Sequence, residues 1–246
     1  MKERSGLELT SNALHLLAMG LMLCDHLWLT MASGNEWMTC VGRLSFPIFA
    51  FLLSEGYFYT KNRKRYGLRL LLFAVLSEIP FNLMVGGRPI PPPQQNVLWS
   101  FLICLVLIYW NESARLSGKR WLRVLVACGS VLAACLLGIL TLVDYVHGGI
   151  LTVLVFYFFR DRNWKCFLAQ LVCLGFINLV MLAGPVFELS LPGMTISFPR
   201  QGFALLALIP IWLYRGERGS RSKALQLSYY LFYPLHLFIL GIVKMM

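Results

Sequence analysis

The chain has 246 residues, of which 58% are hydrophobic and only 13% are charged. Soluble domains carry about 25% charged residues, and a chain of this length cannot bury so much apolar surface in a larger core, which excludes an ordinary soluble domain. The net charge of +11 could suggest a nucleic-acid partner, but the basic residues fall in short clusters between apolar runs, a pattern typical of membrane-flanking charge. We therefore expect the lipid bilayer as partner, and no nucleic acid.

The N-terminal segment resembles a signal peptide only superficially. Lys2 and Arg4 precede an apolar run, but Asp25 and His26 interrupt that run and no A-x-A cleavage site follows it. We interpret it as an uncleaved first transmembrane helix. The seven cysteines form no C-x-x-C pair and lie mostly in apolar runs, so we expect small buried side chains and neither a disulfide framework nor a metal site.

Apolar runs long enough to cross a bilayer recur along the whole chain. A crossing helix needs about 20 such residues, and the runs predict one all-α transmembrane domain over residues 1–246, a polytopic bundle of about nine helices with a range of eight to ten. The predicted spans are 13–31, 45–60, 67–85, 97–113, 121–142, 145–160, 165–184, 199–214 and 226–244. Spans 145–160 and 199–214 are short, so tilted, re-entrant or partly buried segments are expected there. Polar linkers are expected over 86–96 and 184–200.

The distribution of basic residues predicts the orientation. Nine spans place alternate loops on opposite sides, and all but four of the 22 Lys and Arg residues then fall on the side of the N-terminus. The four exceptions are Arg43, Arg88, Arg200 and Lys244. Basic loops stay in the cytoplasm, so the N-terminus is predicted inside and the C-terminus outside.

Ionisable groups at membrane depth are costly and usually mark a site or a pathway. Most such groups here fall toward the outer ends of the predicted spans, with Glu55 deeper and with Tyr233 and His236 near the middle of the last span. The outer group is Asp25, His26, Arg43, Glu78, Asn82, Asn96, Asp144, His147, Arg200 and Gln201. Interhelical hydrogen bonds explain Asn82, Asn96 or Gln201, taken singly, as well as a site does.

His26 is the strongest candidate for chemistry. A neutral imidazole can act as a general base near pH 7, and a carboxylate can orient it. Neighbouring residues on a helix point about 100° apart, so Asp25 need not be its partner. Asp144 or Glu78 could serve instead. The sequence leaves this choice open.

The first and last spans each carry a polar stripe. His15, Met19, Met22 and His26 are spaced by 4, 3 and 4 residues, and Tyr229, Tyr233, His236 and Leu240 repeat that spacing. For the first stripe, the spacing alone favours helix packing over a path lined by one helix face. No H-E-x-x-H, G-x-S-x-G or P-loop pattern occurs in the sequence, which argues against metal, serine and nucleotide hydrolysis.

Several stretches resemble the TraX family of membrane proteins, which includes the pilin N-acetylase of conjugative plasmids. They are M-L-C-D-H-L (22–27), G-R-L-S-F-P-I-F-A-F-L-L-S-E-G-Y (42–57), S-E-I-P-F-N-L (77–83), Q-N-V-L (95–98), V-D-Y-V-H-G-G (143–149) and L-F-Y-P-L-H-L (231–237). The second stretch is the most specific. The resemblance implies a multi-pass acetyltransferase of the bacterial cytoplasmic membrane that uses acetyl-CoA as acyl donor and no metal.

The resemblance extends in style to the acyltransferase-three enzymes, which share a basic residue and a histidine, separated by ten residues, on the first helix. The histidine corresponds to His26 and the basic position to His15, where lysine or arginine would be typical. The family often has aspartate where this chain has Asn82. That departure would leave Glu78, Asp25 or Asp144 to supply a catalytic carboxylate.

The mechanism expected from these residues is acyl transfer across the membrane. Acetyl-CoA would enter from the cytoplasm past His15, Lys61, Arg63 and Arg65, and His26 would deprotonate an acceptor amine or hydroxyl, with Asp25 or Asp144 stabilising the imidazolium. Arg43 or Asn96 would stabilise the oxyanion. The further candidates for substrate or cofactor binding are Glu55, Glu78, Asn82, His147, Tyr233 and His236.

The acceptor and two rival functions stay open. A peptide amine, a sugar or a small amine would fit as acceptor. Buried carboxylates and histidines fit a proton-coupled transporter of small solutes equally well, and a non-catalytic assembly factor of a conjugation or secretion system is the third possibility.

Overall fold

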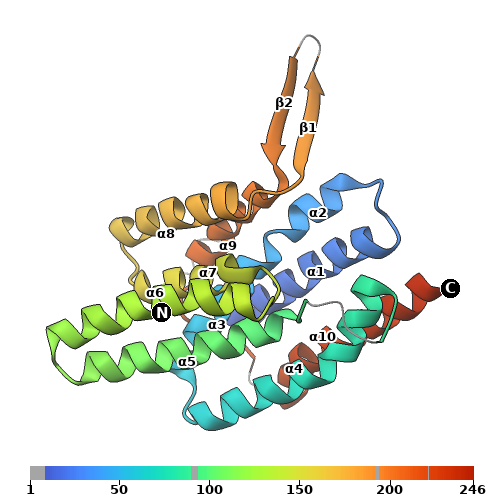
Figure 1. Ribbon diagram of the computed structural model, residues 1–246. Coiled ribbons are helices and arrows are strands. Elements are labelled where there is room, and N and C mark those ends of the chain that lie inside the picture. Colours follow the sequence, from blue (N-terminus) through green and yellow to red (C-terminus); the bar gives the residue numbers. More distant parts are fainter. Residues whose placement is uncertain (1–8, 90–93, 192–193, 221) are drawn as a thin grey trace, which may run out of the picture.

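A computed structural model describes residues 9–89, 94–191, 194–220 and 222–246. Its main elements are helices (Figure 1). In chain order they are α1 (Ser11–Thr30), α2 (Glu36–Gly42), α3 (Ser45–Tyr59), α4 (Arg63–Gly86), α5 (Val97–Leu116), α6 (Arg120–Leu140), α7 (Val146–Phe158), α8 (Trp164–Phe176), a π-helical turn η1 (Ile177–Met181), strands β1 (Val186–Leu191) and β2 (Met194–Pro199), a 3-10 helix η2 (Arg200–Ala207), α9 (Leu208–Leu213) and α10 (Lys223–Met245).

The predicted membrane bundle is confirmed, although the count of nine is not. Seven helical segments among the described residues are long and apolar enough to cross a membrane, with α2 and α3 counted as one segment and α8 and η1 as another. The segments Val146–Phe158 and Arg200–Leu213 are apolar but shorter, and they coincide with the two spans that the sequence marked as short.

Helix α7 lies inside the bundle. Its 13 residues span about 20 Å, less than the roughly 30 Å of hydrocarbon, and it packs against α3, α5 and α6. A Cβ atom on Gly138 would lie 2.5 Å from the backbone of His147, so this glycine allows α6 and α7 to approach closely. Because α7 is surrounded by protein, it does not need the length of a lipid-facing helix.

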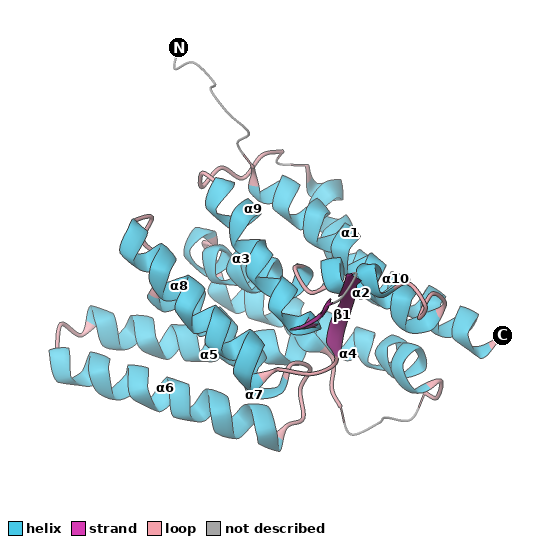
Figure 2. Ribbon diagram, turned by 90° about the horizontal axis from the view of Figure 1, so that it is seen from above, coloured by secondary structure: helices cyan, strands magenta, loops and turns pink. Residues whose placement is uncertain are grey.

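Helix α6 faces lipid on most of its surface and packs through one narrow stripe. Its buried residues are Ser130, Ala134 and Gly138, a four-residue spacing of small side chains that permits close helix contact in membranes. Asn111 of α5 donates a hydrogen bond of 2.6 Å to the hydroxyl of Ser130. Helix α3 is the opposite case: 11 of its 15 residues are buried, so it forms the centre of the bundle (Figure 2).

Loops that the charge pattern assigned to one side lie together. At the end assigned to the cytoplasm, hereafter the inner end, the amide of Ser11 donates to the carbonyl of Glu217 at 2.8 Å. At the outer end, the amide of Asp144 donates to the carbonyl of Gln95 at 2.9 Å. Lys2 and Arg4 lie outside the described residues, and the assignment of the inner end to the cytoplasm stays a prediction.

The prediction of an irregular linker over 184–200 is wrong, because this segment contains a β-hairpin. Strands β1 and β2 pair antiparallel from Val186↔Pro199 to Leu191↔Met194. The two runs are V-F-E-L-S-L and M-T-I-S-F-P. From Phe187 and from Met194 onward they alternate apolar and polar residues with the period of two that is typical of a strand. The other expected linker, 86–96, includes residues 90–93, which lie outside the described residues.

Candidate functional site

A cavity of about 1230 Å³ follows helix α1 through the bundle. Its lining includes both Ser11 and Leu29, which are about 27 Å apart along the helix at 1.5 Å per residue. Every member of the stripe His15, Met19, Met22 and His26 lines it. This face of α1 thus borders the cavity along its length, and it also packs against α10, where the His15 ring stacks on Tyr229 with centroids 4.5 Å apart.

Basic residues surround the inner part of the cavity. Lys61, Arg69 and Arg218 line it, and the guanidinium of Arg69 lies 5.4 Å from the centre of the Tyr230 ring. Lys61 was expected at this entrance, whereas Arg69 and Arg218 were missed, because the sequence does not show which basic side chains turn toward a cavity.

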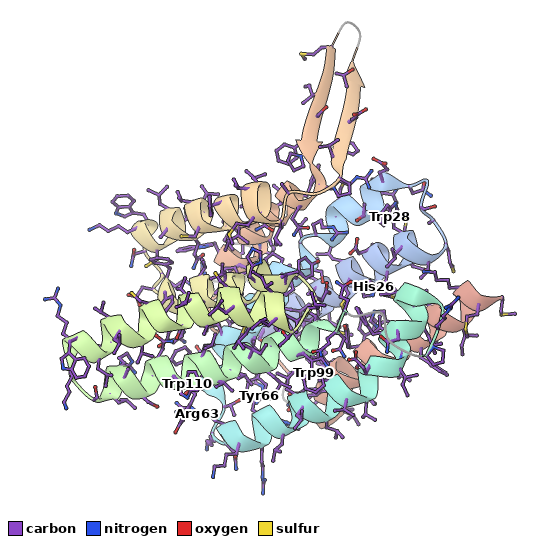
Figure 3. All side chains as sticks on the ribbon, viewed as in Figure 1. His26, Trp28, Arg63, Tyr66, Trp99 and Trp110 are labelled. Atoms are coloured by element: carbon purple, nitrogen blue, oxygen red, sulfur yellow. The ribbon has the colours of Figure 1, made fainter. Side chains whose placement is uncertain are left out.

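The other two predicted entrance residues point elsewhere. Arg63 and Arg65 are not part of the described cavity lining, and the guanidinium of Arg63 lies 4.4 Å from the centre of the Tyr57 ring (Figure 3). Asn62 caps α4 through a hydrogen bond from the backbone amide of Arg65, and the Arg65 side chain is solvent-exposed.

His26 is held by a second histidine and not by a carboxylate. Its Nδ1 atom lies 2.8 Å from Nε2 of His236 on α10, and the two rings are nearly parallel. Nδ1 of His236 lies 2.6 Å from the carbonyl oxygen of Phe232. A carbonyl can only accept, so His236 donates from Nδ1 and its neutral ring must accept at Nε2.

This chain of hydrogen bonds fixes the tautomer of His26. Because Nε2 of neutral His236 accepts, Nδ1 of His26 must be the donor, and the lone pair of the neutral His26 ring stays on Nε2. His26 lines the cavity near the outer end of α1 (Figure 3). In this tautomer His26 can accept a proton only at Nε2.

Asp25 pairs with Arg43 instead of with His26. The hydroxyl of Thr39 donates to the Asp25 carboxylate at 2.6 Å, and Arg43 donates to the same oxygen at 3.2 Å and to Thr39 at 2.8 Å. Gly42 faces Asp25 so closely that a Cβ atom would clash with it, which is why glycine is needed where α2 crosses α1. Asp25 and Arg43 both line the cavity.

Asp144 lines the same part of the cavity from the turn before α7. Its carboxylate accepts hydrogen bonds from the Tyr145 amide at 2.9 Å and from the Gln94 side chain at 3.3 Å. Burial raises the pKa of Asp144 from 3.8 to about 6, although the Tyr145 amide and the charge of Arg43 oppose the rise. This carboxyl therefore changes charge close to neutral pH.

We expect the Asp144 carboxyl to lose its proton near pH 6, because burial penalises the charged form. Infrared difference spectra recorded across the pH range would show the carbonyl band of the protonated Asp144 carboxyl disappearing at that pH. The variant Asp144→Asn would lack this change. The control Asp161→Asn, in an exposed turn, would retain it. The folded state binds this proton more tightly than the unfolded chain, so its contribution to stability falls as the pH rises from 3.8 to about 6. An unchanged band in Asp144→Asn would contradict the assignment.

Glu78, Asn82 and Asn96 lie outside the described cavity lining, and Glu78 and Asn96 form a polar contact between α4 and the start of α5. Asn96 caps α5 by accepting from the Leu98 amide, and its amide group donates to the Glu78 carboxylate at 2.5 Å. Trp99 donates to the same carboxylate at 3.0 Å (Figure 3). Asn82 donates to the carbonyl of Pro89, in the loop after α4. The geometry therefore fits the interhelical interpretation for Asn96, whereas Asn82 bonds within its own helix–loop segment.

The remaining predicted residues divide between the cavity and the bundle interior. Glu55 and Tyr233 line the cavity, and Glu55 forms an ion pair of 2.5 Å with Arg160 near the inner end. His147 lies outside the described lining, and its buried Nδ1 atom has no hydrogen-bond partner among the described residues.

Comparisons with known proteins agree with this architecture. A family model described as "TraX protein" matches residues 10–244. A curated protein of Dichelobacter nodosus, "Probable fimbrial assembly protein FimC, serogroup H1", is 27% identical over 244 residues, covering 94% of this chain and 94% of its own. No solved structure matches. Because the family model extends over nearly every helix, from the start of α1 to the end of α10, this multi-pass membrane protein belongs to the TraX family.

Proposed function

We propose that the protein is a membrane-embedded acetyltransferase that moves an acetyl group from cytoplasmic acetyl-CoA to an amine or hydroxyl at the outer side. The observation that carries this proposal is the cavity along α1, which borders Lys61, Arg69 and Arg218 at one end and His26 at the other. This arrangement supports a phosphate-bearing donor at the inner part of the cavity and a general base toward its outer part.

The cavity suits a long, mixed-polarity donor. Its volume of about 1230 Å³ exceeds the roughly 300–1,000 Å³ of most small-molecule pockets. Lysine and arginine side chains at the inner end offer charged N–H groups that can donate hydrogen bonds to phosphate oxygens. Met19 and Met22 line the section between that end and His26, and their flexible apolar side chains suit an uncharged arm that carries a thioester.

His26 would act as the general base. Its Nε2 atom would take the proton of the acceptor while the acceptor nitrogen or oxygen bonds to the acetyl carbonyl carbon. The carbon–sulfur bond of the thioester then breaks, and the sulfur leaves with the bonding electron pair. No protein nucleophile is needed. General-base catalysis of this kind contributes about 10²- to 10⁴-fold to a rate.

The charged groups near His26 would support this step. Arg43 lines the cavity and can donate to an oxygen that becomes negative, while its bond to Asp25 holds the guanidinium in place. Asp144, on the same part of the cavity, would be ionised above about pH 6 and could offset the positive charge of the imidazolium.

The name of the relative supports a fimbrial subunit as the acceptor, which would receive the acetyl group on a peptide amine. The same name also favours a second candidate, an assembly factor without catalysis. Purified protein in liposomes, supplied with radiolabelled acetyl-CoA and with bacterial envelope extract as acceptor source, distinguishes the possibilities. Labelled product supports acetyl transfer. Donor neither bound nor consumed contradicts it, and flux of a small solute coupled to protons would favour a transporter.

Arg69→Gln is expected to weaken acetyl-CoA binding about tenfold, or about 1.4 kcal/mol, because it removes a cation that lines the cavity. Arg65→Gln is the matched control, since it makes the same charge change one helical turn away and outside the described lining. Titration calorimetry of the purified variants measures both dissociation constants. Equal losses in the two variants would indicate general surface charge and would contradict a phosphate site in the cavity.

A further inference from the structure

The β-hairpin of β1 and β2 follows η1, at the outer end of α8, and projects sideways from the bundle (Figure 1). Its base is fixed by Arg200, which donates to the carbonyl of Val186 at 3.2 Å and forms an ion pair with Glu36 of α2. The hairpin runs crosswise to the long helices in Figure 1, and in Figure 2 it is seen nearly end-on. Because membrane-crossing helices tilt only about 20° from the bilayer normal on average, the hairpin extends along the plane of the membrane.

The two faces of the hairpin differ in polarity. Side chains alternate between the faces of a strand, and paired residues share a face, so the pair Phe187↔Phe198 is on one face and the pair Glu188↔Ser197 on the other. Ile196 and Met194 follow on the phenylalanine face, and Thr195 follows on the polar face. The apolar side chains of β2 are well exposed, at 39% for Phe198, 44% for Ile196 and 55% for Met194.

Contacts at the base show which way the apolar face looks. The rings of Phe187 and Phe198 meet the ring of Phe203 edge-on, with centroids 5.9 and 5.5 Å apart. Phe198 also covers Gly202, where a Cβ atom would clash with it. Both contacted residues belong to η2, at the start of the segment Arg200–Leu213, which runs from the hairpin toward the inner end. The apolar face therefore looks toward the bilayer and the polar face toward water.

We propose that this hairpin is an interfacial arm that rests on the lipid surface at the outer end, with Phe198, Ile196 and Met194 among the headgroups and upper acyl chains. Aromatic and aliphatic side chains with a polar opposite face favour that depth of a membrane. Leu182 and Gln201, which flank the hairpin in sequence, both line the cavity. The arm thus adjoins the cavity wall at both of its ends, whatever reaction takes place inside.

Adjacent cysteines on the two faces test the proposal. Ile196→Cys and Ser197→Cys, each in full-length protein in phosphatidylcholine and phosphatidylglycerol vesicles, would be labelled with a membrane-impermeant maleimide. The unsubstituted protein gives the background from its native cysteines, and labelling in dodecyl sulfate gives the total. We expect Ser197→Cys to react on the order of tenfold faster than Ile196→Cys in vesicles, and both to react alike in dodecyl sulfate.

Two results would overturn the proposal of an interfacial arm. Equal rates in vesicles would mean that both faces are in water. Protection of Ile196→Cys that disappears as the lipid-to-protein ratio rises would mean that a second copy of the chain covers the apolar face. Thermal unfolding of both variants confirms that they fold. A nitroxide on each cysteine gives an independent depth, with lipid-dissolved oxygen broadening the signal at 196 more than at 197 if the proposal holds.

Discussion

Replacing His26 with alanine is expected to lower the rate of acetyl transfer by about 10²- to 10⁴-fold, because it removes the general base. The measurement is the transfer of radiolabelled acetyl groups from acetyl-CoA to envelope acceptors by purified protein in liposomes. Acetyl-CoA binding should change little, since the basic residues that line the inner part of the cavity remain.

His15→Ala is the matched control for this experiment. His15 is on the same face of α1 and lines the same cavity, about 16 Å nearer the inner end at 1.5 Å per residue. It should affect donor binding more than the rate at saturation. Full activity in His26→Ala, with unchanged thermal unfolding, would refute the assignment of the base.

Replacing His236 is expected to have the second largest effect, because His236 sets the tautomer of His26. His236→Leu removes the acceptor for His26 Nδ1–H. The imidazole of His26 can then turn, or its proton can shift to Nε2. With Nε2 protonated, that atom no longer serves as the base. Misplacing a catalytic group in this way can lower a rate about 10²-fold. We expect kcat to fall by that order while the KM for acetyl-CoA stays nearly constant.

The variant His236→Gln distinguishes the role of His236 as a hydrogen-bond acceptor from a purely structural role. The amide oxygen of glutamine can reach the position of imidazole Nε2 and accept the same hydrogen bond, so this variant should recover much of the kcat lost in His236→Leu. If both variants lose activity equally, or if both raise KM along with unfolding at lower temperature, His236 acts through packing and the tautomer argument fails.

Composition and pattern alone determined the class of protein. The excess of apolar residues, their arrangement in runs and the alternating basic clusters predicted the membrane bundle, the positions of the helices and the two short segments over 145–160 and 199–214. These features are local, because each residue's preference for lipid or water depends little on its neighbours in space. Local motifs also indicated His26 as a candidate base and indicated the family, and the family match confirmed the latter.

The pairing of polar side chains was decided only by the tertiary structure. His26 and His236 are 210 residues apart, and no spacing rule connects them. Asp25, the neighbour of His26 in sequence, turns to Arg43 instead. Which side chains meet depends on how far each helix is rotated about its axis, and that rotation follows from many weak packing contacts distributed over the bundle.

The rotation of each element about its axis also explains which features of the cavity and of the hairpin the sequence predicted and which it missed. The sequence identified a basic cluster near Lys61 but not that Arg69 faces the cavity while Arg65 does not. It contained the alternation of the hairpin but not the contact of Phe198 with Phe203 that orients its apolar face. Hydropathy places a residue along the membrane normal, whereas its direction around the helix or strand is fixed only when the elements pack together.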